Sequence, residues 1–338
     1  MFVRALLAVF LFSAAGKAAP AMPVSLKDGS SRFLSRSLGA ACYTMDSVQR
    51  GLPCNPAGIA KGRAPRFDGD FVIGTQAAYL REAEDILRGE DRKQAVLEFF
   101  KQRESVEAEV SAEISFQTAK WGVAIEPYRL IAVTRFENPA LPMVDMVIAE
   151  EQSVKGQIAS YTSENFYAGL QVRYTHVRYI DQYFSLSEAV AGNNDELFAA
   201  QTQDLLYIEP GFLYAWEDVA WQPQVSAVLA HWGITSKKTD AYAVQPQGLL
   251  GTSVKPPMPL GLLEVGIQAH LQSETRNLRD AFRAALSYQI GILQTVVSLS
   301  EYDRSAGFLL SYKNFSTGLS YWDENQARGV FMQLGVSL

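Results

Sequence analysis

The sequence lacks any long hydrophobic run beyond its first residues. After residue 21, no stretch approaches the roughly 18 consecutive uncharged apolar residues that indicate a transmembrane helix. The sequence therefore argues against a helical membrane protein. It also lacks an excess of positive charge, because its formal net charge is −6. A nucleic-acid-binding protein would carry clustered Lys and Arg side chains, so we expect no nucleic-acid partner.

Residue types that carry chemistry are scarce as well. There are three histidines, scattered along the chain at His176, His231 and His270. The sequence contains no G-x-S-x-G elbow, no H-E-x-x-H pair and no Walker phosphate loop. Two cysteines alone do not make a zinc site. We therefore expect neither an enzyme nor a protein that holds a metal or another cofactor.

The first residues of the chain indicate export. A positive charge at Arg4 precedes a largely apolar run from Ala5 to Ala15, and small residues follow it. This order predicts a secretory signal peptide over residues 1–21. A buried N-terminal helix is the alternative interpretation.

The two cysteines, Cys42 and Cys54, lie close together in the sequence. An exported protein meets an oxidising compartment, in which such a pair can form a disulfide. Two unlinked, buried thiols are the alternative.

Residues 76–104 show the spacing of an amphipathic helix. Apolar residues recur on one helical face, and charged residues fill the positions between them. The first of these apolar residues are Tyr79, Ala83, Ile86 and Leu87. Gly89 is expected to divide the segment into two helices. The mixed charges favour a helix that packs on its own protein, while a surface for a protein partner is the alternative.

Residues 105–338 read as a succession of strands. In 106–116 and 263–271, apolar and polar residues alternate, so each strand has one apolar and one polar face. In the second segment, Glu264, Gln268 and His270 share the polar face and are candidates to line a lumen. Further segments bring the total to roughly 12 to 14 strands of the length that tilted membrane strands need. Among them are 121–126, 128–136, 143–149 and 154–162.

Two features favour a closed membrane barrel over a soluble β-sandwich. The alternation continues from Val330 to Leu338, and aromatic residues such as Trp216 and Tyr321 lie near strand ends, as at membrane interfaces. Backbone groups in lipid have no water to bond, so an all-β membrane protein must close its sheet. We therefore predict an antiparallel transmembrane β-barrel. A soluble periplasmic β-rich binding protein, with apolar faces turned inward, remains the alternative.

A short motif precedes the predicted helix. It consists of Leu38, Gly39 and Ala40 followed, after a spacer, by Asn55, Pro56, Ala57 and Gly58. This segment resembles the N-terminal segment of the FadL-type outer-membrane transporters of long-chain fatty acids and other hydrophobic compounds. The helical insertion also resembles the TraF-like, conjugation-associated relatives of those barrels.

The resemblance implies a barrel of about 14 strands in the bacterial outer membrane, with the N-terminal segment folded inside as a hatch. In that family the ligand passes a hydrophobic pocket and leaves through a lateral opening in the wall. A bridge between Cys42 and Cys54 would staple the hatch. The expected parts are a signal peptide (1–21), a hatch (22–75), a helical insertion (76–104) and a barrel (105–338).

Two functions follow from this interpretation. A transport barrel would admit a hydrophobic small molecule, and it predicts an apolar pocket next to the hatch and a gap or kink in one wall strand. A plugged structural barrel in a secretion or conjugation apparatus would instead have a filled lumen, a disulfide-locked plug and an exposed helical segment over 76–104 as a docking surface. Besides the outer-membrane lipid, the expected partners are therefore a hydrophobic small molecule or a protein.

Overall fold

The computed structural model describes residues 37–38, 41–46, 51–62, 64–74, 77–89, 105–137, 143–185, 187–188, 197–236, 242, 246–271, 281–301, 303–324 and 327–338. The expected signal peptide lies outside these residues, as do Gly39, Ala40 and the second half of the expected helical insertion.

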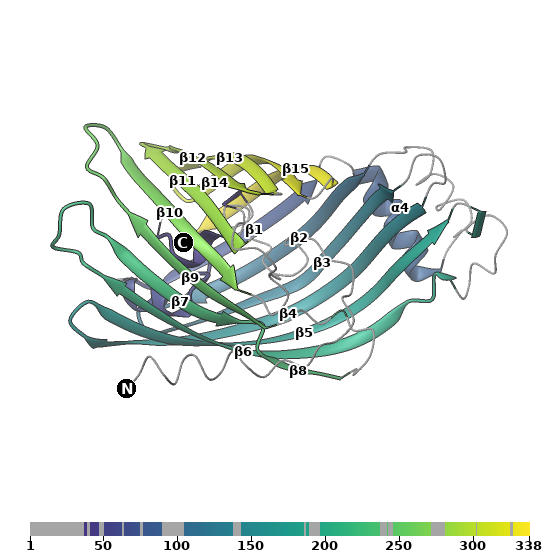
Figure 1. The fold of residues 1–338 in the computed structure, drawn as a ribbon, viewed down its shortest axis with the longest axis horizontal. Coiled ribbons are helices and arrows are strands. Elements are labelled where there is room, and N and C mark those ends of the chain that lie inside the picture. The colour runs from purple at the N-terminus through teal and green to yellow at the C-terminus, as the bar shows by residue number, and fades with distance from the viewer. Residues whose placement is uncertain are drawn as a thin grey trace.

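The strands of the described residues belong to one sheet (Figure 1). They are β1 (Arg66–Gly74), β2 (Val106–Gln117), β3 (Trp121–Glu137), β4 (Met143–Ser163), β5 (Phe166–Ser185), β6 (Gln201–Ala215), β7 (Gln224–Ala230), β8 (Gly233–Thr235), β9 (Gln247–Val254), β10 (Leu262–Leu271), β11 (Phe282–Ile290), β12 (Leu293–Ser300), β13 (Asp303–Tyr312), β14 (Phe315–Glu324) and β15 (Ala327–Ser337). Each wall strand pairs antiparallel with its neighbours, and the pairing of β5 with β6 closes the ring. Because β7 and β8 both pair with β6 as two parts of one wall strand, the fifteen strands make a wall of fourteen. The predicted all-β antiparallel barrel is confirmed.

Pro127 lies inside a strand rather than between two. The ladder between β3 and β4 shifts register between Glu126 and Arg129, which is a β-bulge. Proline has no N–H to donate to the ladder, so it is tolerated in a sheet interior only at such a bulge. The expected separation of 121–126 from 128–136 is therefore wrong, since both belong to β3. In the same way β4 is one strand that runs through both 143–149 and 154–162.

The barrel begins earlier than the sequence suggested. Strand β1 pairs with both β2 and β15, so its residues belong to the barrel and not to the expected hatch over 22–75. The two acidic residues Asp68 and Asp70 and the glycine between them hid the strand, because they interrupt the apolar pattern. Asp68 faces inward and is buried against the hatch, where its carboxylate accepts a hydrogen bond from the backbone N–H of Gly51 at 3.0 Å.

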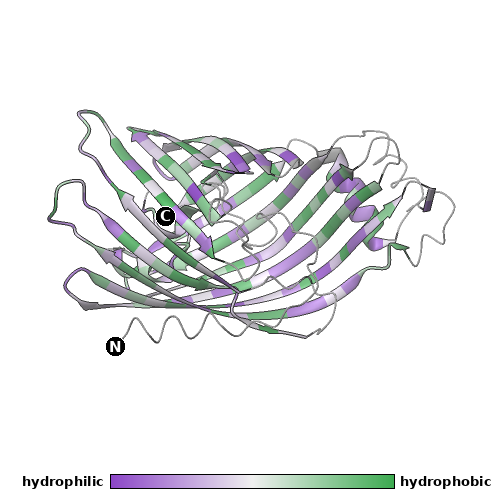
Figure 2. Cartoon of the chain, in the orientation of Figure 1, coloured by the Kyte–Doolittle hydropathy of each residue, from purple (hydrophilic) through white to green (hydrophobic). Residues whose placement is uncertain are grey.

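The outer face of the wall carries a belt of exposed apolar side chains. Ile158 on β4 is 59% exposed, and alternate residues around the ring are apolar and exposed too. Examples are Phe71, Ile114, Val154, Phe212, Ile267, Val297, Leu319 and Leu334. Figure 2 shows the resulting alternation of hydrophobic and hydrophilic residues along the strands. A soluble protein would not leave such a belt in water, so the soluble binding protein is not supported and the barrel is membrane-spanning.

The two ends of the barrel differ. At the end where β1 begins and β15 stops, here called the terminus end, two-residue turns such as Gly291–Ile292 and Lys313–Asn314 join neighbouring strands. At the opposite loop end, longer connections cover 186–200 and 236–246.

Helix α4 (Ala77–Arg88) lies against the outside of the wall at the loop end (Figure 1). Its apolar face, which includes Tyr79, Ala83 and Ile86, packs on outward-facing residues of β2, β3 and β4. Arg178 on β5 donates a hydrogen bond to the carbonyl oxygen of Leu87 at 3.0 Å, near the helix end. The helix stops at Gly89, which has a positive φ of 87°. None of the helices in the described part of the chain combines the length and apolar character needed to cross a membrane.

Candidate functional site

The Asn55-Pro56-Ala57 segment forms a capped turn inside the barrel. Asn55 is the N-cap of the 3₁₀-helix η2 (Pro56–Lys61), and its side-chain oxygen accepts a hydrogen bond from the backbone N–H of Ala57 at 3.0 Å. Pro56 fits the first helical position because its missing N–H is not needed there. The amide nitrogen of Asn55 donates to the carbonyl oxygen of Phe212 on β6 at 3.1 Å. The motif therefore caps its own helix and binds the wall with one side chain.

This turn rests on a pair of glycines in the wall. Gly169 on β5 and Gly211 on β6 are direct cross-strand partners. A Cβ atom on Gly169 would lie 2.4 Å from the carbonyl carbon of Pro56, and one on Gly211 would lie 2.3 Å from Asn55 Oδ1. Any larger residue would therefore push the turn away, so the two glycines form the seat of the hatch.

A disulfide joins the two halves of the hatch. Cys42 lies in the 3₁₀-helix η1 (Ala41–Tyr43), and Cys54 immediately precedes the Asn55 cap. The two Cα atoms are 5.9 Å apart, and the bridge closes a loop between residues 12 positions apart. The expected disulfide is therefore present, and it ties η1 to the segment seated on the glycines.

An ion triad fastens the hatch to the terminus end. The Asp46 carboxylate lies 2.5 Å from Nζ of Lys61 in η2 and 2.5 Å from Nζ of Lys255 in the turn after β9. Burial alone would raise the pKa of Asp46. The two ammonium groups outweigh burial and hold this pKa below its ordinary value of 3.8. Asp46 is therefore ionised and forms an ion pair with each of the two lysines.

Hydrogen bonds tie the hatch to much of the wall. Thr44 Oγ1 and Ser226 Oγ on β7 are 2.5 Å apart, and Gln157 on β4 donates to the carbonyl oxygen of Pro53 at 2.8 Å. Ser37 Oγ donates to Ser320 Oγ on β14 at 2.7 Å. Together with the bonds of β1 and β6 above, these contacts surround the hatch. In this conformation the hatch is thus a plug that hydrogen bonds hold against the wall.

The pocket that the transport hypothesis places next to the hatch is small. A cavity lined by Tyr43, Met45, Asn55 and Leu213, among others, has a volume of about 20 Å³. That is room for about one water molecule. A hydrophobic ligand does not fit in this cavity in the conformation described.

A charged layer crosses the lumen on the loop-end side of the hatch. Arg129 on β3 is fully buried, with its guanidinium 3.2 Å from Glu109 and 2.9 Å from Glu151. Two further buried ion pairs lie in this layer. They are Lys155 with Glu113 at 2.9 Å and Arg173 with Glu209 at 3.4 Å. Buried charges are stable only when they are paired, so these ion pairs hold the side chains of the layer in place.

Beyond the charged layer, the lumen wall becomes apolar. Nine buried residues form what we call the upper apolar cluster: Ile131, Val133, Val147, Ala149, Val177, Tyr179, Leu205, Tyr207 and Tyr242. Eight of them face inward from β3, β4, β5 and β6, and Tyr242 comes from the connection between β8 and β9. The apolar lining therefore lies toward the loop end and away from the hatch.

One wall strand is broken beside this cluster. Between β7 and β8, His231 adopts a positive φ of 56°, and its backbone N–H is bonded to the Glu209 carboxylate at 2.9 Å instead of to a strand. Pro210 on β6 lies just beyond the last pair of the ladder between β6 and β7, Gly211 with Val228, and it has no N–H to donate to a ladder. The described residues show no ladder between β8 and β9, because β9 begins at Gln247 opposite Ala230. We call this interruption the wall break.

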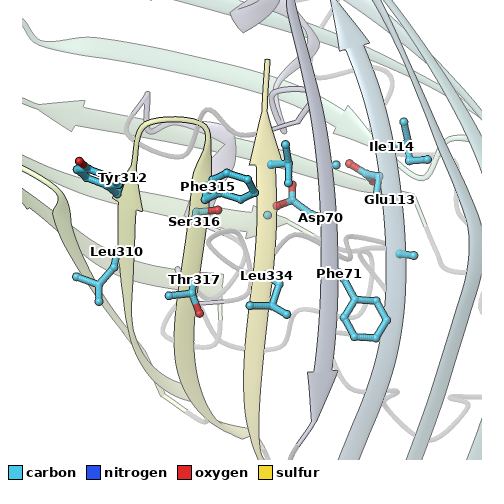
Figure 3. Close-up of a pocket in the computed structure, with 14 residues that line it drawn as sticks. Asp70, Phe71, Glu113, Ile114, Leu310, Tyr312, Phe315, Ser316, Thr317 and Leu334 are labelled. Atoms are coloured by element: carbon cyan, nitrogen blue, oxygen red, sulfur yellow. The ribbon is translucent and has the colours of Figure 1, made fainter.

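One hollow lies on the outside of the barrel. A groove of about 730 Å³ runs over β13, β14, β15, β1 and β2 (Figure 3). The residues that line it include Phe71, Leu310 and Leu334. It lies in the exposed apolar belt, where lipid covers the wall.

The remaining predicted site residues also face inward. Glu264 is buried and accepts hydrogen bonds from the backbone N–H of Asp46 at 2.9 Å and from Ser253 Oγ at 3.0 Å. Gln268 and His270 are buried next to each other, with Nε2 atoms 2.8 Å apart. Leu38 is fully buried in the hatch. Glu264 thus anchors the hatch.

Sequence reasoning missed the glycine seat, the charged layer and Tyr242. Pro127 and Pro210 were visible as prolines inside alternating segments, which indicate bulges. Glu109 falls on the polar face of the alternating segment 106–116, whereas its partner Arg129 follows Pro127, which interrupts the pattern of its own strand.

Comparison with known proteins gives likenesses of structure only. No protein family matches the sequence, and no curated protein matches it. The toluene transporter TbuX of Ralstonia pickettii is 8% identical, with a TM-score of 0.49 over 92% of this chain and 98% of that one. The P. putida toluene transporter TodX is 9% identical, with a TM-score of 0.47 over 92% and 97%. The monoaromatic hydrocarbon channel CymD is 9% identical, with a TM-score of 0.45 over 90% and 95%. These values describe similar barrels and assign no ligand to this chain.

Proposed function

We propose that this protein is an outer-membrane barrel that passes hydrophobic small molecules from the loop end of its lumen sideways through the wall break. The terminus end then faces the periplasm and the loop end faces outward, as in other outer-membrane barrels with short periplasmic turns. The proposal agrees with the FadL-type motif in the hatch.

One observation carries the proposal: the wall break adjoins the upper apolar cluster. The ring of His231, at the break, lies 5.6 Å from the ring of Tyr207, which belongs to the cluster. Trp232 and Ile234 follow on the outer face, where they are 54% and 71% exposed. The upper apolar cluster and the lipid-facing surface therefore come close together at this point.

The seated hatch supports a sideways route. Straight passage would require the loss of the glycine seat, the Asp46 ion triad and hydrogen bonds to several strands. Passage through the wall break leaves all of these contacts intact. Transport should therefore continue when the hatch is fixed to the wall.

The test is uptake by cells that produce the protein, compared with cells that produce an unrelated barrel. Radiolabelled ethylbenzene, 4-ethylphenol and decanoic acid serve as probes. A second disulfide from Thr44→Cys with Ser226→Cys locks the hatch, because the two oxygens it replaces are 2.5 Å apart. We expect faster uptake of at least one probe, unchanged by the lock. Uptake no faster than in the control cells contradicts transport, and uptake abolished by the lock contradicts the sideways route.

A plugged structural barrel is the second candidate function. It is favoured by the same hydrogen bonds around the hatch, since they fill the terminus end of the lumen. The helix α4 gives it less support, because its apolar face is covered by the barrel wall and only its charged face is free for a partner. Absence of uptake for all three probes would favour this function.

A further inference from the structure

Tyr242 is the one member of the upper apolar cluster that does not come from a wall strand. Its side chain is buried, and its ring centroid lies 5.2 Å from that of Tyr179. The other members of the cluster project from the wall strands, whereas Tyr242 enters the lumen from a connection at the loop end. The wall therefore provides an apolar site, and one side chain of the same protein occupies it.

The hydroxyl group of Tyr242 faces a hydrogen-bond acceptor that a second contact holds in place. It donates to Glu151 Oε1 at 2.6 Å, while the other oxygen of Glu151 accepts from Arg129 at 2.9 Å. Burial, and then the Glu151 carboxylate, raise the pKa of Tyr242 well above its ordinary value. The tyrosine is therefore a neutral donor, and the site combines apolar walls with one charged hydrogen-bond acceptor at its base.

We propose that the upper apolar cluster is a ligand site and that Tyr242 occupies the place of the ligand. The ligand class is a neutral hydrophobic molecule with a hydroxyl donor, of which an alkylphenol is the simplest example. This inference rests on the proposed function, because the ligand must reach the lumen from the loop end.

The acceptor determines which molecules can replace Tyr242. A hydrocarbon without a hydroxyl would leave Glu151 Oε1 buried without its donor, which is costly. A carboxylate would bring a negative charge next to Glu151 and Glu109, while Arg129 is already engaged by both. An alkylphenol restores the ring and the hydrogen bond together. The site should therefore select hydroxyl-bearing molecules over hydrocarbons and fatty acids.

The test measures binding to the purified full-length protein in detergent by titration calorimetry, with 4-ethylphenol and ethylbenzene as probes. Tyr242 competes with the ligand in the wild type, so the apparent affinity is reduced by the fraction of molecules in which the site is free. We expect wild type to bind 4-ethylphenol more tightly than ethylbenzene. Tyr242→Ala should bind 4-ethylphenol roughly tenfold more tightly than wild type. Tyr242→Phe, which keeps the ring and loses the hydrogen bond, should lie between them.

Several outcomes would overturn the inference. Equal affinities of wild type and Tyr242→Ala place the ligand elsewhere. Binding by Tyr242→Ala alone shows only that the substitution created a cavity. Equal affinity of wild type for both probes removes the role of Glu151. Tyr183→Ala, which changes a tyrosine that is 54% exposed, is the matched control and should bind like wild type. If these tests fail while cells still show uptake, only this inference is lost and the proposed transport stands.

Discussion

Gly169 and Gly211 face each other across β5 and β6, and the backbone of Asn55-Pro56 lies directly on them. Two residues without side chains thus allow the wall backbone and the hatch backbone to approach each other closely. This close approach is possible because neither glycine has a side chain, and single substitutions can test it.

Gly211→Ala should loosen the hatch. Its new methyl group would lie 2.3 Å from Asn55 Oδ1, so the cap must shift or separate from the wall. We expect a several-fold faster proteolysis of the hatch, with the barrel still resistant to SDS until it is boiled. Gly156→Ala on the outer face of β4 is the control, because a Cβ there meets no atom within 4 Å. Equal proteolysis of the two variants would show that the seat is unimportant.

Removal of the disulfide should affect the hatch more than the barrel. For a loop of this size, a cross-link contributes roughly 3 kcal/mol by restricting the unfolded chain. The Cys42→Ser, Cys54→Ser variant should therefore keep its heat-modifiable mobility on a gel while its hatch is cleaved faster. Addition of a reductant to wild type should reproduce the effect. A variant that no longer forms an SDS-resistant barrel would mean that the bridge is needed for the fold of the wall.

The Asp46 triad predicts a dependence on pH. The pKa of Asp46 is lower in the folded protein than its ordinary value of 3.8, so the unfolded state binds a proton first as the pH falls. The contribution of the triad is therefore complete above about pH 4 and is lost as the pH falls through the folded pKa. Pepsin cleavage of the hatch measures this between about pH 5 and 2. Asp46→Asn should be cleaved faster at pH 5, with a smaller further change on acidification. A variant that matches wild type at both ends of this range would contradict the role of the triad.

Arg129 should be among the most sensitive positions of the wall. Arg129→Met leaves Glu109 and Glu151 buried without their cation, and the loss of one partner of a buried ion pair costs about 3–5 kcal/mol. Arg88→Met removes a half-exposed partner of Glu84 on α4, a type of pair worth about 0.3–0.5 kcal/mol. The midpoints of urea unfolding in detergent give the comparison. Similar shifts for the two variants would show that the charged layer is open to water.

The barrel itself was predictable because period-two alternation is a local property of the sequence. The alternation does not predict the positions of its irregularities, because Pro127 interrupts it inside β3 and the acidic residues interrupt it inside β1. The resemblance predicts the hatch motif at Asn55-Pro56-Ala57. It does not predict the glycine seat, because Gly169 and Gly211 acquire their role only when two strands are in register beneath the motif. Tyr242 was unpredictable for the same reason: its position depends on tertiary contacts with four strands.

The hydrogen bond between Ser37 and Ser320 joins residues 283 positions apart. The hatch, at the start of the chain, thus completes its contacts only when the last strands are present. Non-local pairing of this kind slows folding, because the chain loses conformational entropy when its distant ends are brought together, before the stabilising contact forms. The hatch precedes the wall strands in the chain, so it is synthesised before them and makes its last contacts only when the ring closes. Mutations in the glycine seat should therefore delay assembly as well as weaken the finished barrel.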